Sequence, residues 1–426
     1  MMKKCAFTIC AKNYIGLALS LKKSVEANST DVDFYIFVAD EIKEIIELSD
    51  SCIIEAKKIC SLDEKLWYEM AFMFDLVEFC TAIKPYCFKY LMANGYNKLI
   101  YFDPDIFIFD SIDFIYEKLD QYKCILTPHV INPHQLPEEI RQERDPWGLM
   151  SGINNLGFAA FCKCETTEQV IDWWGTKLQR YAVSEVSEGL FTDQKWTDYM
   201  MAMYDTGDIW ISKHLGMNFA PWNYHERDVC LENERYVIKR RYCEKEWKDP
   251  LVFFHCSGYD YTSLMEGCPK TDRVTNVYRE NILDLLKECG DRLNGSDFKK
   301  YLFLSYSYKS FNNGMVINSF IRRQFRRLCI EDYELGNPFD INSLFYKLMK
   351  TNKLLSKQSI QAIKIKPSMI SGFKNKIKWV DYSFVIIKCF LSSEKYILLC
   401  RLLNKYCRFE NQARLLNRKY RNLDIR

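Results

Sequence analysis

Asp103 and Asp105, two aspartates one residue apart, are the residues whose type and spacing most clearly indicate chemistry. They directly follow Lys98–Phe102, a short apolar segment typical of a buried strand. In a parallel sheet, ligands bind beyond the carboxyl ends of the strands. Two carboxylates at such an edge can hold a divalent cation that bridges two phosphates. An ordinary acidic turn is the alternative, since aspartate is common in turns. The position at a strand end favours a metal site.

The elements that must position this pair alternate along the chain. Short apolar segments predict strands, and apolar residues three and four positions apart predict helices. The predicted strands are Lys4–Cys10, Asp33–Ala39, Cys52–Ala56, Lys98–Phe102, Cys124–Thr127, Gly152–Phe161 and Val252–His255, and the predicted helices include Ile15–Asn28, Glu69–Ala93 and Thr167–Tyr181. Pro85 interrupts the second of these helices. This alternation is typical of an α/β fold whose mostly parallel sheet is flanked by helices.

Charge divides the chain into two parts. Residues 301–426 contain 24 basic and 8 acidic residues, a net charge of +16, whereas residues 1–300 have a net charge of −13. Such a split indicates two parts with different partners. We therefore expect a globular α/β domain over residues 1–290 and a helical, basic C-terminal region over residues 291–426.

The basic region contains three clusters of cations, in Ile321–Leu328, Lys374–Trp379 and Asn417–Arg421. Aromatic and aliphatic residues alternate with these cations, which is typical of helices that bind an anionic membrane surface. A solvated helical domain is the alternative. Nucleic acid is not an expected partner, because no helix-turn-helix, RRM or zinc motif accompanies the charge.

The 18 cysteines and the N-terminus bear on location. The cysteines lack the paired spacing of a zinc module. The N-terminus has too few apolar residues for a signal peptide, and no apolar run is long enough to span a membrane. We therefore expect reduced cysteines and a cytoplasmic protein, bound peripherally to the inner face of the cell membrane.

Six segments, taken in order, resemble the GT-A glycosyltransferases, especially the group related to glycogenin and the bacterial lipooligosaccharide galactosyltransferases. The segments are FTICAKNY, TAIKPYCF, YFDPD, GINNLGFAAF, FTDQKW and FFHCSG, and they span about residues 4–260. The last departs from the His-x-x-Gly-x-x-Lys-Pro ending of the family, because no Lys-Pro follows Gly258. The resemblance implies a Rossmann-like GT-A domain and a hexosyltransferase. Its donor would be a nucleotide-sugar, expected to be a UDP-sugar, and its acceptor a glycan or lipid-linked glycan in surface polysaccharide synthesis.

The resemblance also implies that His255 is the third metal ligand beside Asp103 and Asp105. An imidazole with two carboxylates suits Mn²⁺ better than Mg²⁺, which is the alternative cation. A buried, hydrogen-bonded core histidine is the other interpretation of His255, which ends an apolar segment.

The same resemblance assigns donor contacts to the loop after the first strand and to a lysine. Ala11, Asn13 and Tyr14 would cradle the base and ribose, although Asn13 could instead cap the next helix. Asp40 would bind base or ribose, or cap a helix. Lys84 would contact the diphosphate, or be a solvated helix lysine.

Asp193 and Gln194 resemble the pair that lines the reaction centre of retaining members. Gln194 would stabilise developing positive charge on the sugar, while Asp193 would hold sugar hydroxyls. In an inverting enzyme Asp193 would be the base. A helix cap at the start of a surface loop is the alternative for this pair.

Further sugar contacts are expected from three places. Asn154 and Asn155 lie where the family contacts the donor sugar, and Gly258 follows the metal histidine. Trp222 and Asn223 are the candidates for an acceptor platform, because an indole face can pack against a pyranose ring.

Two other functions remain open at this stage. A sugar-phosphate nucleotidyltransferase also combines an α/β nucleotide fold with a metal, but usually carries a glycine-rich loop after the first strand. A non-catalytic scaffold could keep the fold and bind anionic membranes through the basic region.

Overall fold

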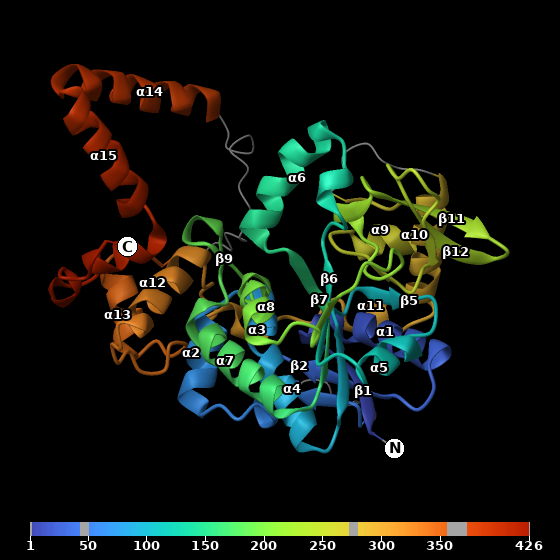
Figure 1. The fold of residues 1–426 in the computed structure, drawn as a ribbon. Helices are drawn as coiled ribbons and strands as arrows, with labels where there is room; N and C mark the ends of the chain where they lie inside the picture. The colour runs from blue at the N-terminus through green and yellow to red at the C-terminus, as the bar shows by residue number, and fades with distance from the viewer. Residues whose placement is uncertain (1, 43–50, 272–279, 356–372, 426) are drawn as a thin grey trace. The chain divides into compact units, whose positions relative to one another are not determined.

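A computed structural model of the chain describes residues 2–42, 51–271, 280–355 and 373–425 (Figure 1). The chain divides into two compact units, Met1–Leu62 with Leu76–Ser307 and Asp63–Asp75 with Tyr308–Arg426. The predicted division after residue 290 falls inside helix α10 (Glu280–Asn294). The segment Asp63–Asp75 joins the second unit, an exchange that a linear charge pattern cannot reveal.

The first unit is built on a seven-stranded sheet with the strand order β10–β6–β7–β4–β1–β2–β3. These strands are β1 Lys4–Cys10, β2 Asp33–Val38, β3 Ile53–Glu55, β4 Lys98–Phe102, β6 Cys124–Pro128, β7 Asn154–Cys162 and β10 Ile209–Ile211. β7 runs antiparallel to its neighbours β4 and β6, and the other neighbours are parallel. The predicted mixed α/β fold with a mostly parallel sheet is confirmed.

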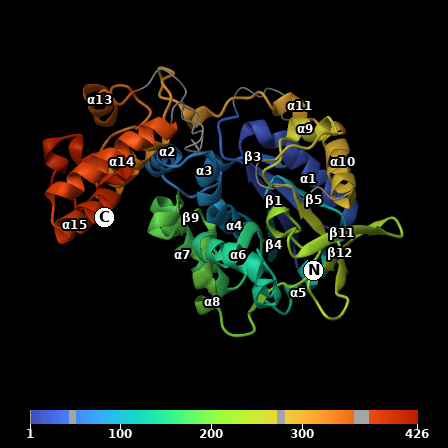
Figure 2. The same ribbon diagram turned by 90° about the horizontal axis from the view of Figure 1, so that it is seen from above.

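Helices cover both faces of this sheet (Figures 1 and 2). Helices α1, α10 and α11 contact one another on one side, and α3, α4 and α7 do so on the other. The helices of the first unit are α1 Ile15–Asn28, α3 Leu76–Ala82, α4 Lys84–Ala93, α5 Asp113–Lys118, α6 Glu138–Ser151, α7 Glu165–Tyr181, α8 Met200–Met203, α9 Tyr261–Met265, α10 Glu280–Asn294 and α11 Phe298–Tyr301.

The predicted helical stretch Glu69–Ala93, interrupted at Pro85, is helical but consists of three helices, α2, α3 and α4, and the break after α2 was not predicted. The first, α2, covers Glu64–Met73 and ends where Phe74 adopts an extended backbone. Pro85 lies in the first turn of α4, where its missing N–H costs nothing. Gly95, with a φ of 88°, follows the end of α4, and its N–H donates to the carbonyl of Met92.

A two-stranded antiparallel ribbon joins the predicted metal residues. β5 (Ile106–Ile108) pairs with β14 (Phe253–His255), so that His255 lies opposite Ile106. This pairing brings the residue after the second aspartate beside a histidine about 150 positions later. The remaining short strands are β8 Ser184–Glu185, β9 Leu190–Phe191, β11 Arg227–Glu232, β12 Arg235–Arg240 and β13 Lys248–Pro250.

The second unit is helical. Its helices are α2 Glu64–Met73, α12 Ser319–Ile330, α13 Leu344–Thr351, α14 Phe373–Phe390, α15 Ser393–Tyr406 and α16 Phe409–Gln412. In the described part of the chain, no helix combines the length and apolar composition that crossing a bilayer requires.

The predicted membrane-binding role of Ile321–Leu328 is wrong, because its arginines are buried in α12. Arg322 donates to backbone carbonyls at the end of α2. Arg323 and Arg326 both pair with Glu410. Guanidinium groups held in this way stabilise the interior of the helical unit and cannot reach an external surface.

Candidate active site

Most of the predicted site residues meet at one edge of the large sheet. Ala11 follows β1, Asp40 lies just beyond β2, and Asp103 follows β4. Because β7 is antiparallel, its first residues, including Asn155, lie at this same edge. His129 follows β6 there as well. The edge therefore joins residues from distant parts of the chain, as expected of ligand sites in α/β sheets.

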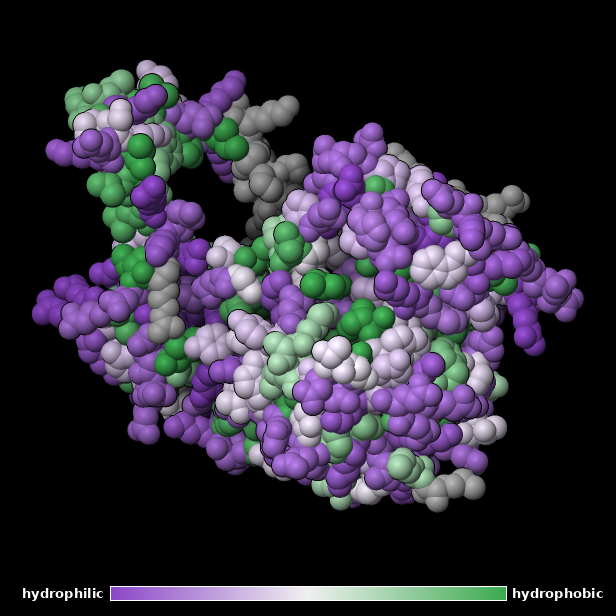
Figure 3. All heavy atoms as spheres, in the orientation of Figure 1, coloured by the Kyte–Doolittle hydropathy of each residue, from purple (hydrophilic) through white to green (hydrophobic). Residues whose placement is uncertain are grey.

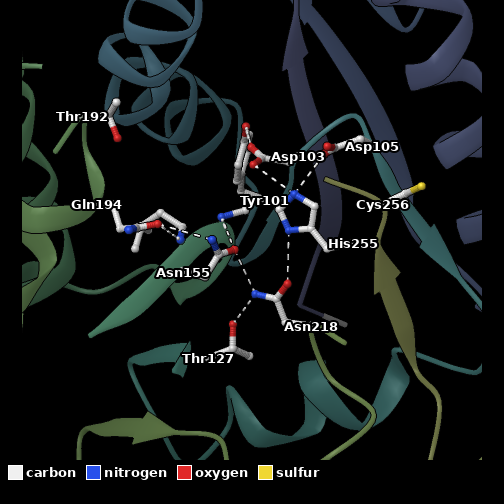
Figure 4. Close-up of polar contacts among 12 residues, drawn as sticks. Tyr101, Asp103, Asp105, Thr127, Asn155, Thr192, Gln194, Asn218, His255 and Cys256 are labelled. Atoms are coloured by element: carbon white, nitrogen blue, oxygen red, sulfur yellow. Dashed lines mark hydrogen bonds and ion pairs between the residues drawn. The ribbon is translucent and has the colours of Figure 1, made fainter. Parts of the chain in front are cut away.

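Asp103, Asp105 and His255 form a compact set of donor atoms (Figure 4). One atom from each side chain lies within 4.8 Å of the others. His255 Nε2 is 3.0 Å from Asp105 Oδ1 and 3.7 Å from Asp103 Oδ2. The histidine side chain is 3% exposed, whereas that of Asp103 is 30% exposed, so the set opens on the carboxylate side.

Two tyrosines orient the carboxylates. The hydroxyl of Tyr101 donates to Asp103 Oδ1 over 2.5 Å, and the hydroxyl of Tyr261 donates to Asp105 Oδ2 over 3.2 Å. Burial raises the pKa of Asp103, while Lys84 and His255 act in the opposite direction. The other oxygen of each carboxylate faces His255.

A chain of hydrogen bonds determines which nitrogen of His255 carries the proton. The backbone N–H of Gly157 can only donate, so the atom of Asn155 that it meets at 3.0 Å is the carbonyl Oδ1. Asn218 Nδ2 also donates to that oxygen over 3.0 Å, and to Thr127 Oγ1 over 2.8 Å. Asn218 Oδ1 must then face His255 Nδ1 at 3.2 Å, where only a ring N–H can donate.

His255 Nδ1 therefore carries a proton, and Nε2 is the ring nitrogen that faces Asp103 and Asp105. The two carboxylates bring like charges together, and a cation held between them and Nε2 would remove that repulsion. The set of one imidazole nitrogen and two carboxylates fits a divalent transition metal such as Mn²⁺. A second residue that orients a metal histidine through its other nitrogen is the usual arrangement in such sites.

Gly157 allows the histidine to lie where it does. A Cβ atom at this position would lie 2.2 Å from His255 Cε1 and 2.6 Å from Nδ1. Any larger residue would push the imidazole away from the carboxylates. This glycine is the second of the two in the segment GINNLGFAAF, and its role was not predicted from the sequence.

Lys84 and Asp193 form a second, fully buried polar cluster. Lys84 Nζ pairs with Asp193 Oδ2 at 2.5 Å and donates to the carbonyl of Leu156 at 2.8 Å. The ammonium group also lies 4.1 Å from the centre of the Tyr101 ring. The structure thus excludes the solvated helix lysine as the interpretation of Lys84. It gives both residues a partner within the protein.

Gln194 belongs to the same cluster. Its Oε1 accepts from Asn155 Nδ2 and from the N–H of Leu156, each at 3.3 Å, and its Nε2 donates to the carbonyl of Ser151 at 2.7 Å. The side chain lies beside Asn155, which also belongs to the chain of bonds that ends at His255 (Figure 4). Asn155 thus connects the two clusters.

His129 is a site residue that the sequence interpretation missed. Its Nδ1 lies 3.0 Å from the carbonyl of Gly152 and 3.2 Å from that of Ile153, so this nitrogen carries the proton. Its Nε2 accepts from Asn155 at 3.4 Å. Burial lowers its pKa to about 4. The signal was present in the sequence, since His129 follows a strand end just as Asp103 does.

The loop after β1 contains a buried acceptor with no partner. Among the described residues, Asn13 Oδ1 is buried and receives no hydrogen bond. Tyr14 packs edge-on against Tyr261, which connects this loop to Asp105. Asp40 Oδ1 accepts from the backbone N–H of Glu41 and of Ser307. Burial raises its pKa, against the effect of those bonds.

The two residues predicted to bind the acceptor sugar, Trp222 and Asn223, have different surroundings in the structure. Trp222 packs edge-to-face against His255, and its buried Nε1 has no hydrogen-bond partner in the described chain. Asn223 is fully buried, accepts from the N–H of Ala220 and donates to the carbonyl of Asn218. Asn223 therefore stabilises its own turn, and the structure does not place it as an acceptor contact.

Two further predicted sugar contacts differ in their surroundings. Asn154 is buried, and neither end of its amide has a partner among the described residues. Gly258 has a φ of 80°, and its carbonyl accepts from Thr271 Oγ1. The first keeps its amide atoms without a partner in the described chain, whereas the second shapes the turn that follows His255.

Comparisons with known proteins give limited matches. No protein-family model matches the chain. It is 24% identical over 263 residues to the uncharacterized protein YfnF of Bacillus subtilis (strain 168), covering 61% of this chain and 82% of that protein. Among solved structures, the galactosyltransferase LgtC in complex with donor and acceptor sugar analogs has a TM-score of 0.38 and 13% identity, over 68% of this chain and 96% of that one. The glycosyltransferase GlyE of Streptococcus pneumoniae TIGR4 has a TM-score of 0.36 and 13% identity, over 73% and 67%.

Proposed function

We propose that the chain is a metal-dependent glycosyltransferase that moves a hexose from a nucleotide-sugar, expected to be a UDP-sugar, to a glycan or lipid-linked acceptor. The observation that carries this proposal is the convergence of Asp103, Asp105 and His255 Nε2, while His255 Nδ1 is held by Asn218. A divalent cation held there, Mn²⁺ or alternatively Mg²⁺, would neutralise the charge of a diphosphate leaving group.

Buried polar atoms without partners support a large polar ligand at this edge. Asn13 Oδ1, the amide of Asn154 and Trp222 Nε1 are all buried and unbonded in the described chain. Leaving such groups unpaired costs free energy, which a ligand recovers by bonding them. We assign Asn13, with Ala11, Tyr14 and Asp40, to the nucleotide, and Asn154 and Asn155 to the donor sugar.

Gln194 is the polar side chain that we assign to the reacting sugar. Its Oε1 accepts two bonds of 3.3 Å, long enough to be exchanged for a ligand at small cost. Lys84 holds Asp193 in place beneath it and screens negative charge near Asp103. This arrangement favours a retaining reaction, in which Gln194 stabilises developing positive charge on the sugar.

The acceptor and the location complete the proposal. The exposed lysines of α14, Lys376 and Lys378, support a lipid-linked acceptor at an anionic membrane, as in surface polysaccharide synthesis. We propose a cytoplasmic protein bound peripherally to the inner face of the cell membrane.

The test is a thermal-shift screen of UDP-, GDP-, CMP- and dTDP-sugars with Mn²⁺ and with a chelator. The wild type is compared with Asp105→Asn and with Asp205→Asn, which changes an exposed aspartate outside the site. Stabilisation by one nucleotide class is expected, dependent on Mn²⁺, lost in Asp105→Asn and retained in Asp205→Asn. If none of these nucleotide-sugars stabilised the folded protein, the result would contradict the proposal and favour a non-catalytic scaffold.

Product analysis separates the transferase from the nucleotidyltransferase alternative. A glycosyltransferase releases a nucleoside diphosphate from its donor, whereas a nucleotidyltransferase releases pyrophosphate. Release of pyrophosphate from a nucleoside triphosphate and a sugar phosphate would overturn the assignment, even if the metal site were confirmed.

A further inference from the structure

Helices α14 and α15 form a hairpin, residues 373–406, whose apolar side chains are exposed. In α14, Trp379 is 75% exposed and Phe390 is 84% exposed. No residue of α15 is buried. Figure 3 shows apolar residues gathered over these two helices. Large apolar groups held in water are unfavourable, so this surface indicates a partner.

Four of the exposed apolar residues of α14 form a stripe. Trp379, Tyr382, Ile386 and Phe390 follow one another at intervals of three, four and four residues, which places them on one face of the helix. All four are exposed. The half-buried side chains of α14, Phe384 and Ile387, lie on another face of the helix, and its neighbour in the described chain is chiefly α15. Within the described part of the helical unit, the stripe therefore has no counterpart.

Cations border this stripe. Lys376 lies three positions before Trp379, and Lys378 lies four positions before Tyr382, so each is adjacent to the stripe on the helix surface. Of the basic segment predicted over Lys374–Trp379, the described side chains begin at Lys376. Among the described side chains of the hairpin, the cations are Lys376, Lys378, Lys388, Lys395, Arg401 and Lys405, against the acidic Asp381 and Glu394.

We infer that this hairpin docks on an anionic lipid surface, with the stripe of α14 in the interface and the lysines at the headgroups. α14 has 18 residues, about 27 Å of helix, but it is too charged to cross a bilayer. A helix with an aromatic face and bordering lysines is suited to lie in the membrane interface instead. Tryptophan and tyrosine favour this region because their rings are apolar and their polar atoms reach water.

The positive charge of the hairpin favours an anionic lipid surface as its partner over the same hairpin of a second copy of the chain. Two such faces packed together would bring their lysines close to one another, and the repulsion would oppose pairing. Anionic headgroups, in contrast, complement these lysines. The inference rests on the proposed function for the lipid-linked acceptor, whereas the docking itself needs neither metal nor nucleotide.

The experiment is flotation of the full-length protein with phosphatidylcholine vesicles, with and without phosphatidylglycerol, at low and high salt. The wild type is expected to bind anionic vesicles at low salt and to bind less at high salt. Trp379→Ser/Phe390→Ser should weaken this binding at least tenfold, because two aromatic side chains no longer enter the interface. Lys376→Gln/Lys378→Gln should weaken it about 30-fold, at about fivefold per cation.

Phe303→Ser is the matched control, since Phe303 is an equally exposed aromatic residue outside the hairpin, and it should bind as the wild type does. Equal vesicle binding by wild type and Trp379→Ser/Phe390→Ser would overturn the inference. So would a concentration-dependent dimer, seen by light scattering without lipid, that this variant abolishes while vesicles bind neither protein. Donor binding in the thermal-shift screen should be unchanged in the variant, so failure of the docking and failure of the transferase are distinguishable.

Discussion

The two polar clusters at the sheet edge differ in whether their charged groups find partners of opposite charge within the protein. Lys84 and Asp193 neutralise each other in a buried ion pair. Asp103 and Asp105 instead bring two carboxylates together beside His255 Nε2. Buried charge is expensive unless it is paired. The first cluster is therefore complete as it stands, whereas the second is the place where we propose that a cation binds.

The two histidines show the same difference. In the part of the chain that the structure describes, both ring nitrogens of His129 are hydrogen-bonded to protein groups. His255 uses Nδ1 on Asn218 and keeps Nε2 for the carboxylates. Residue type alone cannot distinguish a structural histidine from a ligand. The group that faces the second ring nitrogen distinguishes the two roles.

The largest expected effect comes from breaking the complete cluster. Lys84→Met leaves Asp193 buried without a counter-ion, which should lower the free energy of unfolding by about 3–5 kcal/mol. Urea unfolding followed by fluorescence measures this. The double variant Lys84→Met/Asp193→Leu should recover most of the loss, because no charge then remains unpaired. A single variant as stable as the wild type would show that the pair is not the complete unit described above.

Acid should destabilise the folded protein through His129. Its pKa is about 4 in the folded chain, against about 6.5 in an unfolded one. The unfolded state therefore binds the proton first as the pH falls. The difference between the two pKa values contributes about 3 kcal/mol to the free energy of unfolding. This contribution is fully present above pH 6.5 and is lost as the pH falls from 6.5 to 4.

Urea midpoints across this pH range test the contribution of His129. His129→Gln should flatten the dependence, whereas His134→Gln, at an exposed histidine, should not change it. Identical profiles for the two variants would assign the acid sensitivity to other groups.

Crowding the metal histidine should weaken the second cluster. Gly157→Ala places a methyl group against His255 and should lower Mn²⁺ affinity about 10- to 100-fold. Isothermal titration calorimetry measures the affinity. Gly148→Ala is the control, because a Cβ there meets no atom within 4 Å. Unchanged affinity in Gly157→Ala would mean that His255 is not a ligand.

The smallest expected effect lies farthest from the metal. Thr127→Val removes the hydroxyl that accepts from Asn218 Nδ2 and leaves one buried N–H unpaired. Stability should fall by about 1 kcal/mol, and Mn²⁺ affinity should fall less than in Gly157→Ala, because Asn218 still bonds Asn155 and His255. The same titration and urea unfolding measure both. An affinity loss as large as that of Gly157→Ala would show that Thr127 orients the histidine more directly.

Two basic helices show that a local sequence pattern can predict a helix but not whether its charged face is exposed. Ile321–Leu328 and the segment beginning at Lys376 both predict a charged amphipathic helix, and both are helical. Only the second is exposed, because Glu410 and backbone carbonyls bind the arginines of the first. The partners lie far away in the sequence, so no local pattern could separate the two cases.

The sequence by itself determined the positions of β1 to β4, β6, β7 and β14, of helices α1 and α7, and of the acidic pair at the end of β4, but not of β10 or of β11 to β13. These depend on local periodicity and on residue type at a chain turn. Only the tertiary structure decided that His255 lies 3.0 Å from Asp105, that Asn218 sets its tautomer, and that Lys84 is paired with Asp193. The reason is physical. Hydrogen bonds and ion pairs act over a few ångströms, and folding alone brings these residues within that distance.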